Sequence, residues 1–179
     1  MTTPTASRRT RWAGRLIAGA AVLALWSCAG HAPALPVVPD VDLPRYMGVW
    51  YEIASYPTWF QKGCTGSTAR YHLNADGTVD VLNQCRKGGT LESARGTAWA
   101  PDPGEPAKLK VRFFWPFRAD YWIIDLGPEY EYAVVGHPSR EYLWILSRTP
   151  AMDPAVYACI LQRLRLNGYD PDRLVRADG

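Results

Sequence analysis

Between Gly48 and Arg148, apolar and polar residues alternate in short runs that are separated by turn-forming residues. This period of two is typical of strands that turn one face to a core. Hairpin-length links such as Asn74-Ala75-Asp76-Gly77 indicate an antiparallel meander. We expect eight strands, at Val49–Tyr56, Gly66–Leu73, Thr78–Arg86, Leu91–Trp99, Lys108–Phe114, Asp120–Leu126, Tyr130–His137 and Tyr142–Ser147.

Eight antiparallel strands leave two unpaired edges unless the sheet closes, and a closed barrel of this size can hold one small ligand. After the strands, Asp153-Pro154 begins a helical pattern that ends at Asn167-Gly168. We therefore predict an all-β fold, an eight-stranded antiparallel up-and-down β-barrel with a C-terminal α-helix packed outside. The apolar stripe expected to face the barrel comprises Val156, Cys159, Ile160, Leu164 and Leu166.

The N-terminus has the three parts of a secretory signal peptide: a basic start, an apolar run from Leu16 to Trp26, and the small residue Ser27. The run is too short for a membrane-spanning helix, which needs about 20 apolar residues. Leu25-Trp26-Ser27-Cys28 resembles a bacterial lipobox, whose cysteine takes a diacylglycerol and becomes the new N-terminus. The alternative is an ordinary signal peptide in which Cys28 is incidental.

Three prolines between Cys28 and Asp42 favour a semi-extended tether. We therefore expect a lipoprotein signal peptide at 1–27, a Pro-rich tether from acylated Cys28 at 28–41, and a barrel plus C-terminal helix at 42–179. Ala29, rather than Asp, follows the cysteine, which by analogy favours sorting to the outer membrane. The expected location is the bacterial cell envelope, lipid-anchored on the periplasmic face of the outer membrane.

The charge of the chain gives no reason to expect a nucleic-acid partner. Four of its 20 basic residues are arginines that precede Cys28, which leaves 16 against 17 acidic residues in the rest. The three histidines, His31, His72 and His137, are scattered, and no Cys/His cluster has the spacing of metal ligands. No glycine-rich phosphate loop follows a strand. We therefore expect no metal and no cofactor.

Three short motifs resemble those of the lipocalin family, in its bacterial lipoprotein branch, which is related to apolipoprotein D. The first, G-x-W, is Gly48-Val49-Trp50, the second is present only as Pro128-Glu129-Tyr130, and the third is Arg148 after the last strand. The similarity extends from Asp42 to about Arg176. It implies that the Trp50 ring fills the bottom of the barrel and that the Arg148 guanidinium stacks across it.

Alternate residues of a barrel strand point inward. Counted from Trp50, the inward residues of the first strand are Glu52, Ala54 and Tyr56, and Tyr51 and Ile53 point outward. Counted back from Arg148, the last strand turns inward Leu146, Trp144 and Tyr142. A buried Glu52 must pair with a base or lie near water, because an unpaired buried charge is costly.

The resemblance suggests that Tyr71, Asn83, Phe113 and Tyr121 also face a cavity, together with Tyr142 and Trp144. An aromatic wall with few polar groups suits a fatty acid, a lysophospholipid or a similar amphiphile. We therefore expect a lipid carrier, not an enzyme. The alternatives are a lipid-modifying enzyme, for which Glu52 and nearby tyrosines are the available groups, and a structural envelope lipoprotein whose aromatics fill a solid core.

The remaining cysteines allow one disulfide. Cys64 and Cys85 flank the Asn74–Gly77 hairpin on the same face of the sheet, offset by one diagonal step. Bridging that offset needs a bulge or a twisted strand end. Exported proteins form disulfides, so we expect a Cys64–Cys85 bond, with two free thiols as the alternative. Cys159 is expected to be a buried apolar residue of the helix.

Overall fold

The computed structural model describes residues 1–2 and 33–177, so the signal peptide and Cys28 lie outside the described residues. The sheet order runs from β2 to β8 and then β1, and β1 also pairs with β2, which closes an eight-stranded antiparallel barrel. The predicted fold class is confirmed. The strands are β1 (Gly48–Ser55), β2 (Cys64–Leu73), β3 (Val79–Lys87), β4 (Thr90–Trp99), β5 (Lys108–Phe114), β6 (Phe117–Leu126), β7 (Tyr132–Gly136) and β8 (Leu143–Ser147).

Because each strand reverses direction, the links β1–β2, β3–β4, β5–β6 and β7–β8 lie at one end of the barrel. We call this end the mouth, and the opposite end, where β1 begins and β8 ends, the floor. β6 begins three residues earlier than expected, because Phe114 and Phe117 pair directly across a tight turn. β7 begins at Tyr132, since Tyr130 has a φ of 59° and cannot continue a strand.

Three short elements were not expected from the sequence. The helix α1 (Leu43–Tyr46) lies at the floor, where the Asp42 side chain caps it by accepting from the Arg45 N–H. An Asp followed by Pro44 is a recognisable helix start, and this signal was overlooked. Near the C-terminus, the 3-10 helix η1 (Pro171–Arg173) leads to β9 (Val175–Arg176), which pairs with the last part of β1.

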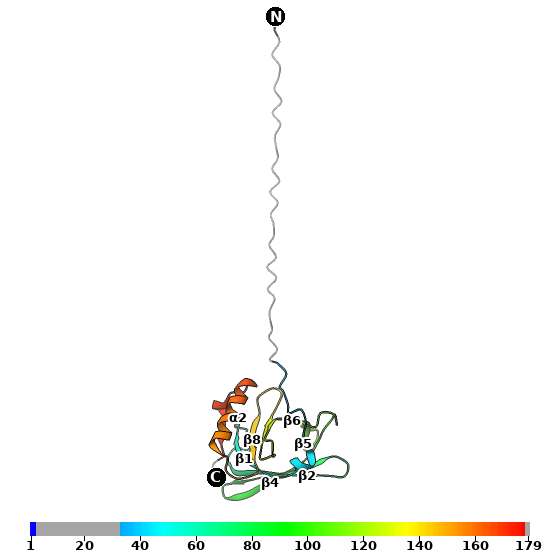
Figure 1. Ribbon diagram of the computed structural model, residues 1–179, viewed down its shortest axis with the longest axis vertical. Coiled ribbons are helices and arrows are strands. Elements are labelled where there is room, and N and C mark those ends of the chain that lie inside the picture. The colour runs from blue at the N-terminus through cyan, green and yellow to red at the C-terminus, as the bar shows by residue number, and fades with distance from the viewer. Residues whose placement is uncertain (3–32, 178–179) are drawn as a thin grey trace. The chain divides into compact units, whose positions relative to one another are not determined.

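The helix α2 (Pro154–Leu166) lies outside the barrel beside β1 and β8 (Figure 1). Asp153 caps it, and Ile160 and Leu164 are buried against the sheet. The expectation for Cys159 and Leu166 was wrong, because both are exposed. Each helical residue turns the direction of its side chain by about 100°, so Cys159 points well away from the stripe through Ile160 and Leu164.

The inward assignment of Ala54 and Tyr56 was also wrong. The pairing of β1 with β8 shifts between Glu52 and Ala54, which marks a β-bulge. A bulge adds one residue and moves every later side chain to the other face. Ala54 and Tyr56 therefore join Ile53 in the outer apolar cluster under α2, and the Tyr56 hydroxyl donates to the Asp170 carbonyl at 2.8 Å.

The segment 33–41 is not a free tether, contrary to the sequence-based expectation. Leu35 and Val41 are buried against the barrel, and the Val38 N–H donates to the Ile123 carbonyl at 3.0 Å. The apolar residues between the prolines account for this, because they cover apolar surface of the sheet that would otherwise face water.

Candidate ligand-binding site

The barrel encloses a cavity of about 950 Å³, which falls in the usual range for small-molecule sites. Its lining includes the exposed Trp59 and Phe60 of the β1–β2 link and the exposed Phe114 and Phe117 of the β5–β6 turn, so it reaches the surface at the mouth. The interior is thus hollow and not a solid core. All six residues expected to face it contribute to its lining: Tyr71, Asn83, Phe113, Tyr121, Tyr142 and Trp144.

The floor is closed by Trp50 and Arg148. Trp50 is fully buried, and its ring lies 3.7 Å from the central carbon of the Arg148 guanidinium. The Arg148 side chain also donates to four backbone carbonyls, those of Val49, Arg45, Tyr46 and Tyr130, at 2.9–3.3 Å. Its planar fork thus joins β1, α1 and the link before β7.

Gly48 permits this arrangement. It has a φ of +98°, which is strained for other residues, and a Cβ there would lie 3.3 Å from an Arg148 guanidinium nitrogen. The altered second motif also packs at the floor. The Tyr130 hydroxyl accepts from the Asp42 N–H at 2.9 Å, and the Arg45 guanidinium lies 4.5 Å from the Tyr130 ring centroid. Thus the motif residues converge although they are about a hundred residues apart in sequence.

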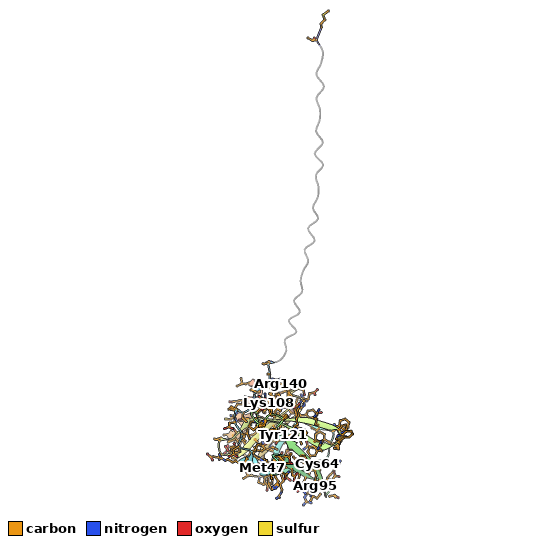
Figure 2. The ribbon with its side chains drawn as sticks, turned by 90° about the vertical axis from the view of Figure 1, so that its right-hand side faces the viewer. Met47, Cys64, Arg95, Lys108, Tyr121 and Arg140 are labelled. Carbon is orange, nitrogen blue, oxygen red and sulfur yellow. A yellow bond between two sulfur atoms is a disulfide. The ribbon has the colours of Figure 1, made fainter. Side chains whose placement is uncertain are left out.

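Three tyrosine hydroxyls meet inside the barrel above the floor. The Tyr121 hydroxyl lies 2.8 Å from that of Tyr46 and 3.0 Å from that of Tyr71. Figure 2 shows Tyr121 in the middle of the barrel. Burial raises the pKa of Tyr71 to about 12 and raises the pKa of Tyr46 and Tyr121 well above 10. All three are therefore neutral near pH 7.

The proton count of this cluster leaves one donor unused. Three hydroxyls carry three protons, and two hydrogen bonds between them use two. Near them on the cavity wall, the Oδ1 atom of Asn83 is buried without a partner among residues 33–177. The tyrosine cluster therefore offers a free hydroxyl donor, and Asn83 Oδ1 a free acceptor, to a polar group of a ligand, and both groups are uncharged.

A second polar network joins the cavity wall to the β1–β2 link. The Trp144 indole N–H donates to Gln61 Oε1 at 3.0 Å, and the Gln61 amide donates to Glu52 at 2.7 Å. The second carboxylate oxygen of Glu52 accepts from the Ser55 hydroxyl at 2.7 Å. The partners of Glu52 are an amide and a hydroxyl rather than a base, and the residue is only half-buried, which agrees with the expected alternative that it lies near water. Tyr142 stacks nearly parallel on Trp144, with ring centroids 6.1 Å apart.

The structure joins Cys64 to Cys85 by a disulfide near the mouth, with the two Cα atoms 5.4 Å apart. The register between β2 and β3 shifts between Thr65 and Thr68, where Gly66 has a φ of 57°. This bulge supplies the local distortion that the diagonal offset requires. The bond thus holds the first residue of β2 against β3, next to the link that carries Trp59 and Gln61.

In the described part of the chain, no three His, Cys, Asp or Glu side chains are grouped so as to hold a metal ion. None of the helices at 33–177 is long and apolar enough to cross a bilayer.

The family of this chain follows from its similarity to known proteins. The model of the lipocalin-like domain matches residues 41–178. The chain belongs to the lipocalin family. Insecticyanin of the tobacco hornworm Manduca sexta has the same fold as this lipocalin, with a TM-score of 0.69 at 22% identity over 84% of this chain and 87% of that one.

Sequence relatives cover most of this lipocalin. Temperature-induced lipocalin-1 of Arabidopsis thaliana is 42% identical over 78% of this chain and 80% of its own length. Outer membrane lipoprotein Blc of Escherichia coli is 36% identical over 88% of this chain and 92% of its own. Apolipoprotein D of Mus musculus is 35% identical, covering 83% and 82%. The expected bacterial lipoprotein and apolipoprotein D relationship is confirmed.

Sequence reasoning missed several residues of the site. Tyr46 was overlooked because α1 was not expected, and Gln61 because it lies in a link without a periodic pattern. The run Phe114-Trp115-Pro116-Phe117 was a usable signal for the mouth, since consecutive aromatic residues are unusual at a polar turn.

Proposed function

We propose that this lipocalin is a lipid-anchored envelope protein that carries a fatty acid, a lysophospholipid or a similar single-chain amphiphile. The observation that carries the proposal is the distribution of polarity in the cavity. Its walls are apolar and aromatic, and the groups deep inside, such as Tyr71 and Asn83, are uncharged. An acyl chain gains free energy from such walls, and the few polar groups set its orientation.

The charged lining residues support entry with the tail first. Glu52, Glu92, Arg118 and Asp120 lie in the halves of their strands nearest the mouth. Arg95 lies near the middle of β4. A charged head group is costly to bury without partners, so it is better placed among these residues, with the chain toward the tyrosines.

Binding is proposed in preference to catalysis. Both carboxylate oxygens of Glu52 already accept hydrogen bonds, from Ser55 and Gln61, and the carboxylate ties the β1–β2 link to the wall. The hydroxyls of Tyr46, Tyr71 and Tyr121 are bonded to one another and have raised pKa values, which makes them poor bases near pH 7.

The anchor is proposed from the sequence Leu25–Cys28 and from the short distance along the chain to the barrel. We propose a signal peptide at 1–27, an acylated Cys28 and location at the outer membrane. The relatives named outer membrane lipoprotein Blc, in Escherichia coli and Vibrio cholerae, support this location.

Mass spectrometry tests both parts of the proposal on protein extracted from membranes in a mild detergent. We expect an intact mass that includes a diacylglyceryl group on Cys28, and a co-purifying single-chain lipid released on denaturation. A variant with Trp144→Ala serves as the comparison, because it should be acylated in the same way and retain less lipid. Extraction of both proteins with no lipid above background would contradict the carrier function.

A further inference from the structure

Five large aromatic side chains are exposed at the mouth of the barrel. Trp59 and Phe60 come from the β1–β2 link, Trp115 from the β5–β6 turn, and Phe114 and Phe117 from the strand ends that flank this turn. Trp59 is 80% exposed and Trp115 is 82% exposed. Exposed apolar groups gathered around one end of a barrel mark an interaction surface, because leaving them in water is unfavourable. We call these five residues the aromatic rim.

Arginines lie beside this rim on the outer face of the barrel. A hollow of about 540 Å³ is lined by Arg70, Arg95 and Arg112 together with Phe114 and Trp115. None of the three arginines forms an ion pair with the described residues 33–177. One carboxylate, that of Asp80, lines the same hollow, so its three guanidinium groups leave a net positive charge, which is suited to phosphate oxygens.

The N-terminal segment enters the barrel unit from the same end. The Arg140 guanidinium, in the β7–β8 link at the mouth, donates to the Pro33 carbonyl at 2.7 Å. Figure 2 shows Arg140 on the side where the described barrel chain begins. Pro33 follows Cys28 by five residues, which span at most about 17 Å when extended.

We propose that the mouth of this lipocalin docks on the surface of a bilayer that contains anionic phospholipid. The aromatic rim enters the interfacial layer, where Trp and Phe are favoured, and Arg70, Arg95 and Arg112 contact head-group phosphates. A bilayer fits these observations because aromatic and cationic groups are adjacent and because Pro33, only five residues after the proposed acylated Cys28, lies at this end. Only this last point rests on the proposed anchor.

Docking in this orientation would open the cavity onto the membrane. Trp59, Phe60, Phe114 and Phe117 line the cavity and belong to the rim at the same time. An acyl chain could then pass between bilayer and barrel without its apolar surface crossing bulk water, which is the costly step of lipid exchange.

Vesicle flotation tests this proposal on residues 33–179, which omit Cys28. This part contains both apolar clusters, the closed sheet and the disulfide, so it holds the whole folded core. Vesicles of phosphatidylcholine alone are compared with vesicles that also contain phosphatidylglycerol. We expect flotation with the mixed vesicles, reduced about fivefold or more by Trp115→Ser, which is outside the cavity lining. Leu166→Ser on α2, equally exposed at 87%, is the matched control and should float like the wild type.

A double variant, Arg70→Gln and Arg112→Gln, changes arginines that do not line the cavity. It should weaken the preference for anionic vesicles, and added salt should weaken binding of the wild type. The proposal is overturned if Trp115→Ser floats as well as the wild type, or if the wild type binds neither vesicle. It is also overturned if Trp115→Ser converts a dimer to a monomer in sedimentation, since the rim would then bind a second copy. Lysophospholipid affinity of the same samples, followed by fluorescence without vesicles, reports separately on the proposed carrier function.

Discussion

The central carbon of the Arg148 guanidinium lies over the ring of Trp50, 3.7 Å from its centroid, although the two residues are separated by nearly the whole barrel sequence. The same guanidinium donates to the carbonyls of Val49, Arg45, Tyr46 and Tyr130, and the Trp50 indole N–H donates to the Tyr46 carbonyl at 2.9 Å. The pair closes the floor with both apolar contact and hydrogen bonds. Its removal should therefore affect stability more than ligand specificity.

Replacing Trp50 with Ala is expected to lower the free energy of unfolding, measured in urea, by about 3–5 kcal/mol, because a fully buried ring is replaced by a void.

Arg148→Ala should lower the free energy of unfolding by about 1–3 kcal/mol, since it leaves backbone carbonyls without donors in a partly exposed position. Arg148→Lys is the informative comparison, because it keeps the charge but loses the planar fork. Urea unfolding that finds Arg148→Lys as stable as the wild type would show that charge alone suffices.

Trp144→Ala is expected to weaken binding of a long-chain fatty acid or lysophospholipid about five- to hundredfold, which corresponds to about 1–3 kcal/mol of apolar contact. The measurement is the change in Trp fluorescence during titration, with a thermal melt to verify folding. Trp99→Ala removes a half-buried ring that does not line the cavity, and it should leave the affinity unchanged. Identical titrations of Trp144→Ala and the wild type would remove Trp144 from the binding site.

The buried tyrosines make stability depend on alkaline pH. The pKa of Tyr71 is about 12 in the folded protein and about 10 in the unfolded chain, so the unfolded state loses its proton first. Stability is fully present below about pH 10 and falls as pH rises toward 12, by about 1.4 kcal/mol per pH unit for each such tyrosine. Tyr71→Phe should reduce this slope in urea unfolding at several pH values, and an unchanged slope would show that Tyr71 ionises normally.

The Cys64–Cys85 disulfide closes a loop with a sequence separation of 21, for which chain entropy gives about 3 kcal/mol of stabilisation. We expect the double variant Cys64→Ser and Cys85→Ser to lose about this amount in urea unfolding. Reduction of the wild type should have the same effect, and it should leave the double variant unaffected. A double variant as stable as the oxidised wild type would show that the bulged end of β2 is held in place without the bond.

After a high-salt wash, Cys28→Ser is expected in the soluble periplasmic fraction, because no acyl chain can be attached and contact through the mouth alone is reversible. Fractionation after a high-salt wash checks this, since salt removes electrostatic contacts of the mouth with lipid. Wild type and variant are compared by immunoblot at equal expression. If the variant still sediments with outer membranes after the wash, acylation of Cys28 is not what holds the protein there.

Much of the site could be predicted from sequence because strand periodicity is a local property. Leu146, Trp144 and Tyr142 are alternate residues, so a regular strand turns all three side chains to the same face. All three residues line the cavity. The same alternation predicted the wrong face of the sheet for Ala54 and Tyr56. The bulge after Glu52, which reverses their direction, depends on how β1 pairs with two different partners. A pairing irregularity of this kind is a property of the neighbouring strands and has no sequence signal in β1 itself.

The alternation of residues by itself determined that this chain forms a closed antiparallel barrel with a helix after it, since each strand needs one apolar face and no free edge. Only the tertiary structure decided that the interior is hollow, since this depends on side chains from all eight strands. It also decided that Tyr46, Tyr71 and Tyr121 share hydrogen bonds, and that Leu35 packs on the barrel. These features arise from residues distant in sequence, whose contacts exist only once the sheet has closed.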